Sequence, residues 1–180
     1  YLRFDRPRSF FAAMSFGNCG YAFPAIIGAK LAAPERPAVA YVGDGAWGMS
    51  FGEILTCVRE NIPVSAVVFN NGQWGAEKKN HVDFYENRFL GVNLDKQPSW
   101  AAVARAMGAE GHTIDKVGDV GAALKAACEA QMQGKTTVGE IVTFMGFATM
   151  LIGRLEQVVG FVNFIFMQAP KMREFFGIWL

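Results

Sequence analysis

Two stretches of the sequence decide the fold: AVAYVGDGAWG at residues 38–48 and VSAVVFNNGQWG at residues 64–75. Each begins with a short apolar run, as expected of a strand that is buried on both faces of a sheet. Each run ends in polar and glycine residues, and a helical stretch separates the two. Because parallel strands end at the same edge of a sheet, we expect Asp44 and the pair Asn70-Asn71 to lie side by side there.

Asp44 and Asn71 offer a carboxylate and an amide oxygen beside a glycine-rich turn that leads into a helix. Such ligands suit a hard divalent cation, which usually shares its coordination sphere with phosphate oxygens. Gly43 and Gly45 allow a tight turn and a close approach of the backbone to phosphate. The first N–H groups of the following helix can then face a diphosphate. These N–H groups are expected to be those of Ala46 and Trp47.

Two other interpretations of these residues compete with a site for a cation and a diphosphate. Residues 43–48 also spell G-x-G-x-x-G, the fingerprint of a dinucleotide site. That site needs an acidic residue about 20 positions on, at the end of the second strand. The second strand ends in Asn70-Asn71 instead, so we reject a dinucleotide site. Two unrelated turns facing solvent would explain each motif alone, but not both motifs on neighbouring strand ends.

The GDG triplet, 24 intervening residues and the NN pair resemble the signature of thiamine-diphosphate enzymes of the pyruvate oxidase and acetolactate synthase group. The resemblance covers about residues 1–142, which are similar to the pyrophosphate-binding domain. The segments FDRPRSFFAAMSFGNCGYAFP, GDGAWGMSFGEILTCVRENIPV and NNGQWGAEKKNHVDFY are most similar to the sulfoacetaldehyde acetyltransferases. The implied fold is α/β, a parallel sheet covered by helices on both faces.

The resemblance also implies a site. Asp44, the amide oxygen of Asn71 and the backbone carbonyl of Gln73 would bind Mg²⁺, with two diphosphate oxygens and a water completing the coordination. The loop at residues 17–20 matches the loop beneath the thiazolium, but has Cys19 where most relatives have Met, Leu or Ile. The residues expected to bind thiamine diphosphate are Asn18, Cys19, Gly43, Asp44, Gly45, Ala46, Trp47, Asn71, Gln73, Trp74 and Gly75.

The implied activity converts sulfoacetaldehyde and phosphate into acetyl phosphate and sulfite, a step of sulfonate metabolism. In this group the activating glutamate lies in a separate pyrimidine-binding domain, so we expect no catalytic residue in this chain and no activity from it alone. The implied partners are that domain, or a second subunit in a homo-oligomer, and the small-molecule substrates. Three alternatives stay open: another acetolactate synthase or pyruvate oxidase type enzyme, a membrane-associated fragment of an ABC exporter, and a non-catalytic binding module or chimera.

Composition restricts the class of protein. The 180 residues carry a net charge of +1, which argues against a nucleic acid partner. Cys19, Cys57 and Cys128 form no C-x-x-C pair, as is typical of a reduced, cytoplasmic protein. Because Tyr1 opens the chain within what reads as mid-protein sequence, we expect a fragment.

The rest of the domain alternates strands and helices, which predicts one parallel sheet. The stretch at residues 73–87 does not alternate like a strand, so Asn71-Gly72 is not read as a hairpin turn. Ser99 is expected to cap one helix and Gly108 to end it. On the helix at residues 50–60, the expected buried face is Phe51, Ile54, Leu55 and Val58. We expect strands at residues 38–42, 64–69, 109–114 and 136–143, and helices within 17–33 and at 50–60, 99–107 and 119–132.

Residues 144–180 differ from residues 1–143 and are treated as a second region. They are rich in Phe, Met, Ile and Val and carry few charges. Their uncharged stretches are each shorter than the roughly 20 residues that span a bilayer, but joined they predict one long apolar helix. From about residue 138 the sequence is similar to the last transmembrane helix of ABC exporters of the cyclic β-glucan type. We therefore expect a chimera, with membrane association only through this tail; a helix that docks on a partner is the alternative.

Lys78 and Lys79 follow the loop at residues 71–74, the metal loop, which carries Asn71 and Gln73. One of them is a candidate contact for the sulfonate or phosphate, with a solvated helix face as the alternative. His81 and His112 lack the spacing of metal ligands or of a nucleophile's base, so we expect structural roles for both.

Overall fold

The computed structural model describes Phe4 and residues 7–142. By its internal contacts the chain divides into two units, Tyr1–Thr143 and Phe144–Leu180. The long apolar helix expected at residues 144–180, and the resemblance of that region to an exporter, lie outside the described residues. Within Phe4 and residues 7–142, no helix has the length and apolar character needed to cross a membrane.

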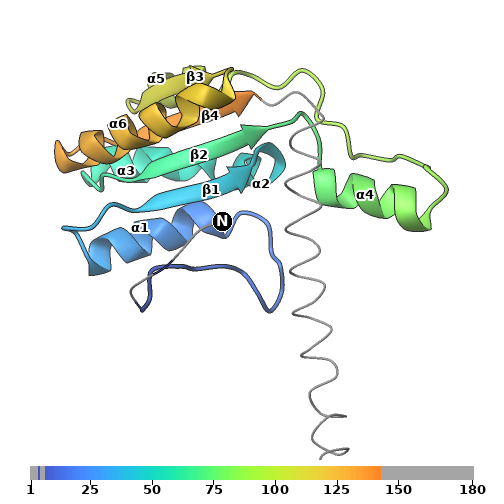
Figure 1. The fold of residues 1–180 in the computed structure, drawn as a ribbon, viewed down its shortest axis with the longest axis horizontal. Helices are drawn as coiled ribbons and strands as arrows, with labels where there is room; N and C mark the ends of the chain where they lie inside the picture. The colour runs from blue at the N-terminus through green and yellow to red at the C-terminus, as the bar shows by residue number, and fades with distance from the viewer. Residues whose placement is uncertain (1–3, 5–6, 143–180) are drawn as a thin grey trace, which may run out of the picture. The chain divides into compact units, whose positions relative to one another are not determined.

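The described residues form a sheet of four parallel strands in the order β1-β2-β4-β3 (Figure 1). All three neighbouring pairs are parallel, which confirms the predicted sheet. In β2, which lies between β1 and β4, residues 65–68 are all buried, as expected of a strand covered on both faces. The strands are β1 Val39–Gly43, β2 Ser65–Asn70, β3 Glu110–Ile114 and β4 Thr137–Val142.

The helices follow the predicted order, except that α4 is added and the chain after the GDG turn forms two α-helices, α2 and α3. Ser99 caps α5 as expected, because its hydroxyl accepts a hydrogen bond from the Ala102 amide at 3.3 Å. Gly108 follows α5 with a φ of +88°, which favours glycine. The added helix, α4, occupies most of the polar stretch at residues 73–87. The helices are α1 Ala22–Ala32, α2 Asp44–Gly48, α3 Ile54–Arg59, α4 Gly75–Phe84, α5 Trp100–Ala106 and α6 Val120–Met132.

Helices cover both faces of the sheet, as predicted. In Figure 1, α6 lies in front of the strands and α3 behind them. The larger core lies under α1, α2, α3 and α5, and contains Phe23, Trp47 and Ile54 without exposed surface. The smaller core lies under α6, where Leu124 packs near Ile141. The two faces therefore differ in how much apolar surface they bury.

The predicted helix at residues 50–60 was wrong in one respect. It begins as a 3-10 turn at Phe51–Glu53 and continues as α3. A 3-10 turn has three residues per turn rather than 3.6, so it rotates the positions that follow relative to a continuous α-helix. As a result Ile54 and Cys57 are buried, whereas Leu55 and Val58 are 53% and 37% exposed.

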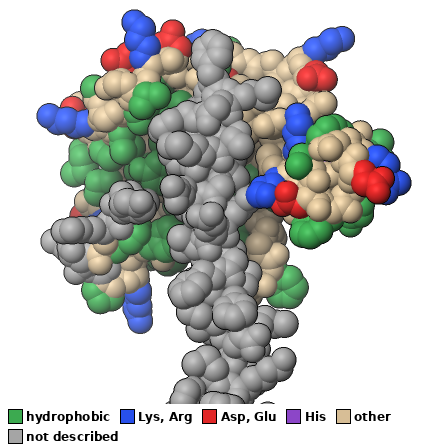
Figure 2. All heavy atoms as spheres, turned by 45° about the vertical axis from the view of Figure 1, so that its right-hand side comes forward, with side chains coloured by type: hydrophobic (Ala, Val, Ile, Leu, Met, Phe, Trp, Pro, Cys, Tyr) green, Lys and Arg blue, Asp and Glu red, His purple; other side chains and the backbone are tan. Residues whose placement is uncertain are grey.

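Helix α4 extends away from the sheet (Figure 1) and has no buried residue. Figure 2 shows this lobe at the right of the view, with hydrophobic side chains beside charged ones. Val82, Phe84 and Tyr85 are all more than half exposed. The position of α4 therefore depends on the segments that flank it rather than on a core of its own.

Candidate functional site

The candidate site lies at the edge where β1 and β2 end. Gly43 is paired in register with Phe69, so Asp44 and Asn70 follow directly at neighbouring positions. Helix α2 begins at Asp44, and the loop with Asn71 begins at the end of β2. The Oδ2 atom of Asp44 accepts a hydrogen bond from the Gly72 amide at 2.8 Å. This bond links the GDG turn to the loop after Asn70-Asn71, and its two residues are 28 positions apart along the chain.

The carboxylate of Asp44 is buried, with 2% of the residue exposed. Its Oδ2 also accepts a hydrogen bond from Nε2 of Gln97 at 3.1 Å. Burial raises the pKa of Asp44, and hydrogen bonds from Gly72, Gln97 and nearby backbone amides oppose that rise. None of the ion pairs among the described residues involves Asp44. A buried carboxylate held only by neutral donors favours a bound cation.

The loop after Asn71 is fastened to residues 92–94. The Trp74 amide donates to the Val92 carbonyl, and the Leu94 amide donates to the Gly72 carbonyl, both at 2.8 Å. These bonds flank the antiparallel bridge between Gln73 and Asn93. They leave the carbonyl of Gln73 outside the ladder. The amide oxygen of Asn71 accepts a bond from the Gln73 amide at 3.2 Å, within the same loop.

The donor set fits Mg²⁺ held together with a diphosphate. It offers one carboxylate, one amide oxygen and one backbone carbonyl, all of them hard oxygen ligands. Among the described residues there is no cluster of three or more His, Cys, Asp or Glu that would enclose a metal ion. A cation at Asp44 would therefore need oxygens from a ligand, which is the usual arrangement for Mg²⁺ at phosphate sites.

Residues 1–140 match the model of the family "Thiamine pyrophosphate enzyme, C-terminal TPP binding domain". The chain belongs to this thiamine pyrophosphate enzyme family. The family's cofactor is thiamine diphosphate, usually with Mg²⁺.

Individual relatives point in the same direction. A sulfoacetaldehyde acetyltransferase from Castellaniella defragrans is 69% identical over 142 residues, which is 78% of this chain and 24% of that protein. A probable sulfoacetaldehyde acetyltransferase from Rhizobium meliloti is 43% identical over 143 residues, or 79% of this chain and 24% of that protein. The chain thus spans about a quarter of the length of these curated relatives.

The fold also matches a solved structure. The thiamine diphosphate-dependent 4-hydroxybenzoylformate decarboxylase of Rhodococcus jostii RHA1 superposes with a TM-score of 0.64 at 26% identity. The match covers 71% of this chain and 23% of that protein. The parallel α/β sheet is therefore the one that the thiamine pyrophosphate enzymes use.

The loop at residues 17–20, which was expected to lie beneath the thiazolium, lies beside α2. A Cβ atom on Gly20 would be 3.2 Å from Cβ of Met49 and 3.9 Å from the Ala46 carbonyl oxygen. Next to it, Cys19 is exposed. Desolvation, and after it the charge of Glu77, raise the pKa of the Cys19 thiol. The chain thus brings this loop next to α2, the helix that begins in the GDG turn.

Trp47 and Trp74 occupy different environments. Trp47 has no exposed surface and packs edge-to-face on Phe23, with ring centroids 4.8 Å apart. Its Nε1 atom is buried without a hydrogen-bond partner among the described residues. Trp74 instead covers Gly45, where an added Cβ would lie 2.9 Å from the indole ring. Gly45 is therefore required for the close packing of this turn against Trp74.

The start of α2 corrects one predicted role. The helix begins at Asp44, two residues before Ala46, with Gly43 as its N-cap. The amide of Trp47 then stands where the first intrahelical bond forms, to the Gly43 carbonyl. Of the two amides expected to face the diphosphate, that of Ala46 stays among the unpaired groups of the first turn.

Gln97 is a site residue that the sequence did not indicate. Its Nε2 donates to Asp44, and its Oε1 accepts a hydrogen bond from Nε1 of Trp100 at 3.0 Å. It lies 53 residues from Asp44 and belongs to no motif. Only the packing of α5 beside β4 and β3 brings it to the strand ends.

The lysines after the metal loop already have partners. Lys78 Nζ donates to the side-chain oxygens of Gln73 at 2.9 Å and Asn93 at 3.0 Å. It also lies 5.4 Å from the centroid of the Phe89 ring. Lys79 pairs with Asp83 along α4. Lys78 therefore stabilises the metal loop, while an anion contact for either lysine stays a prediction.

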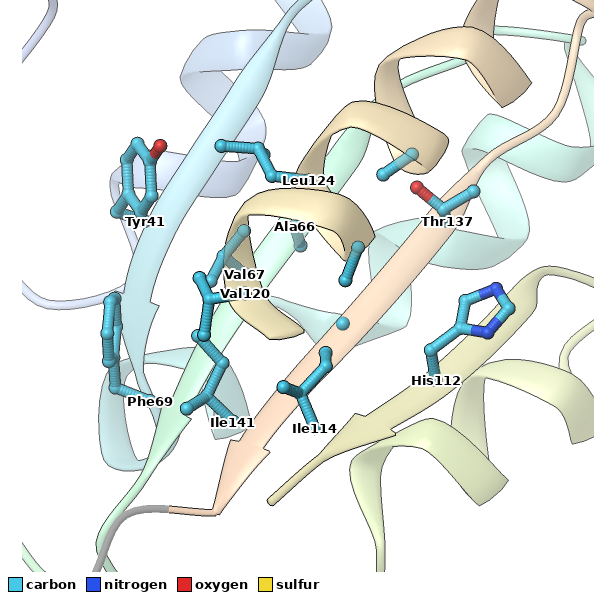
Figure 3. Close-up of a pocket in the computed structure, with 13 residues that line it drawn as sticks. Tyr41, Ala66, Val67, Phe69, His112, Ile114, Val120, Leu124, Thr137 and Ile141 are labelled. Carbon is cyan, nitrogen blue, oxygen red and sulfur yellow. The ribbon is translucent and has the colours of Figure 1, made fainter. Parts of the chain in front are cut away.

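Figure 3 shows an apolar pocket between α6 and the sheet, on the face that carries the smaller core. Tyr41, Phe69 and Leu124 lie along one side of it, and His112 lies at the opposite end. None of the residues predicted to bind cofactor or metal lines this pocket. It is separate from the candidate site, and His112 has no place in that site.

Proposed function

We propose that the edge formed by β1 and β2 binds Mg²⁺ and the diphosphate of thiamine diphosphate. Asp44, the amide oxygen of Asn71 and the carbonyl of Gln73 are the proposed protein ligands of the cation. The observation that carries this proposal is the 2.8 Å hydrogen bond from the Gly72 amide to Asp44, which holds the metal loop against the GDG turn. Mg²⁺ needs its ligands in near-octahedral geometry, so this spacing is central to binding.

The proposed surroundings of the cofactor come from three segments. The GDG turn would approach the diphosphate with its backbone, because Gly43 and Gly45 have no side chain to prevent this. The Ala46 amide, in the first turn of α2, is a further proposed contact of the diphosphate. Trp47 is fully buried and supports α2 from the core. The remaining proposed contacts are Asn18 and Cys19 from the thiazolium loop, and Trp74 and Gly75 at the start of α4.

For the parent protein we propose a sulfoacetaldehyde acetyltransferase, which converts sulfoacetaldehyde and phosphate into acetyl phosphate and sulfite. The 69% identity to the Castellaniella defragrans enzyme supports this choice. Acetolactate synthases are more distant, at 33% identity for the Mycobacterium avium enzyme. Bound thiamine diphosphate supplies the carbanion chemistry, and this chain's residues bind and orient its diphosphate end.

The proposal assigns no catalytic residue to this chain. The activating glutamate would come from a pyrimidine-binding domain, either in the parent chain or in a second subunit of a homo-oligomer. A cytoplasmic location forms part of the proposal, since Cys19, Cys57 and Cys128 are all free thiols. Burial raises the pKa of Cys57 to about 11, as expected of an unreactive structural thiol.

For residues 144–180 we propose an origin separate from the domain before them. The family model matches residues 1–140 and leaves this tail unassigned. Sequencing single molecules of the source nucleic acid across codons 130–150 tests the join. A uniform, genuine join in every molecule would contradict a chimera.

The test of cofactor binding uses the full 180-residue chain. Thiamine diphosphate is titrated with tryptophan fluorescence as the signal, first with Mg²⁺ and then with a chelator. We expect a saturable change that depends on Mg²⁺ and disappears in Asp44→Ala. Asp95→Ala, a loop aspartate with no assigned role in the site, is the matched control and should respond like wild type. A folded chain with no response to thiamine diphosphate and Mg²⁺ would contradict the proposed function.

A further inference from the structure

Glu140 is a buried carboxylate that the proposed site does not use. It lies on β4, in register with Val68 of β2, and only 2% of the residue is exposed. None of the ion pairs among the described residues includes it. Val138, two residues earlier on the same face of β4, is apolar and fully buried. Packing alone would therefore be satisfied by an apolar side chain at residue 140.

Three donors surround the Glu140 carboxylate. Nδ2 of Asn70 lies 2.6 Å from its Oε1, and the Ser99 hydroxyl lies 2.8 Å from its Oε2. The Ala101 amide donates to the same Oε2 at 3.3 Å. The Ser99 oxygen accepts from the Ala102 amide, which leaves its own hydrogen for Glu140. A buried carboxylate is tolerated when its lone pairs are satisfied in this way.

Two of these donors, Asn70 and Ser99, are close in sequence to residues of the proposed metal site. Asn70 directly precedes Asn71, so fixing its side chain restrains the start of the metal loop. Ser99 begins α5 two residues after Gln97, whose amide holds the Asp44 carboxylate. Glu140 thus connects the end of β2 and the start of α5 through one side chain.

We propose that Glu140 is a positioning residue for the metal site. By holding Asn70 and the start of α5, it sets the spacing between Asn71 and Asp44, and it does so without contacting the cation. The inference rests on the proposed function, because it concerns the affinity of the same site for Mg²⁺. Outer residues that orient metal ligands are generally needed for full affinity.

The test is Glu140→Gln in the full chain. Glutamine keeps the shape, but it removes the charge and replaces one acceptor oxygen with an NH₂ group, so it cannot accept hydrogen bonds from all three donors in their present orientation. At saturating thiamine diphosphate, we expect the Mg²⁺ concentration for half-maximal fluorescence change to rise about 10-fold. Thr136→Val is the matched control, since it removes a buried hydrogen bond to the Ile62 carbonyl at the far end of β4. It should lower stability and leave the Mg²⁺ requirement unchanged.

Two further variants separate positioning from folding. Ser99→Ala removes one donor and should shift the Mg²⁺ requirement in the same direction by a smaller factor. Combining Asn70→Ala with Glu140→Gln should raise it no further than the larger single effect, if Glu140 acts through Asn70.

The outcomes are distinct. If Glu140→Gln and Ser99→Ala lower stability as Thr136→Val does but keep the wild-type Mg²⁺ requirement, Glu140 is only structural and the inference is overturned. If wild type itself shows no Mg²⁺-dependent response, the proposed function fails, and the inference fails with it.

Discussion

Helices α2 and α4 both follow the end of a strand at the candidate site, yet they are held in different ways. α2 begins directly after β1, with Asp44 2% exposed and Trp47 fully buried against Phe23. α4 begins five residues after β2 ends and has no buried residue. One is fixed by the core, and the other by hydrogen bonds of the loop that leads into it.

This difference indicates how the site is divided. The Asp44 carboxylate and the turn around it are preorganised, because moving them would disturb the core. Trp74 and Gly75 stand where the chain leaves the body of the domain, held by the short ladder to residues 92–94 and by Lys78. Of the proposed metal ligands, Asp44 thus lies on the side fixed by the core, whereas Asn71 and Gln73 lie in the loop that leads into α4.

The largest expected effect compares two phenylalanines. Phe23 is fully buried under α2, whereas Phe84 at the end of α4 is 74% exposed. Phe23→Ala should lower the free energy of unfolding by about 3–5 kcal/mol, from lost burial and a cavity. Phe84→Ala should change it by less than about 0.5 kcal/mol. Urea denaturation of both variants checks this, and similar losses would refute the contrast between α2 and α4.

The next effect concerns Asp44 and pH. Burial raises its pKa in the folded state, so without metal the folded protein binds this proton more tightly than the unfolded chain does. The contribution of Asp44 to stability is therefore favourable at low pH. It is lost as pH rises from the ordinary aspartate value of about 4 through the raised folded value.

The matched variant for this effect is Asp44→Asn, which does not titrate. In a chelator, the stability of wild type relative to Asp44→Asn should fall with rising pH across that window. With thiamine diphosphate, the Mg²⁺ affinity of wild type should rise over the same window, because protons compete with the cation. Above that window Asp44→Asn should bind Mg²⁺ roughly 100-fold more weakly than wild type, and the difference should narrow as pH falls. Denaturation and Mg²⁺ titrations at several pH values measure both trends, and parallel stability curves would refute the first.

A smaller effect is expected where Gly45 of α2 packs against Trp74, which precedes α4. A Cβ on Gly45 would lie 2.9 Å from the Trp74 ring, so Gly45→Ala should cost about 1–3 kcal/mol and displace that indole. Gly52→Ala is the control, since no atom lies within 4 Å of its added Cβ. Adding Trp74→Ala to Gly45→Ala should recover part of the loss. Tryptophan fluorescence and denaturation decide the matter, and equal effects of the two glycine variants would show that Trp74 yields freely.

The sequence predicted the sheet well because apolar runs and turn residues are local signals. The runs at residues 38–42 and 64–69 became β1 and β2 with a shift of one residue, and Ser99 caps α5 as expected. The buried face of α3 was predicted wrongly at Leu55 and Val58, since the preceding 3-10 turn changes the rotation of the helix. Helix α4 was predicted only in the alternative of a solvated helix face for Lys78 and Lys79 and was not among the expected elements, because its polar residues carry no periodic apolar face.

For the candidate site, the sequence alone determined the chemistry of the motif and its place at two strand ends. It did so because Asp44 and Asn71 follow apolar runs whose parallel pairing brings them to one edge. Only the tertiary structure revealed Gln97 and Glu140. Gln97 lies 53 positions along the chain from its partner Asp44, and Glu140 lies 70 positions from its partner Asn70. Their roles come from the packing of α5 against β3 and β4, which depends on the whole fold and leaves no local pattern.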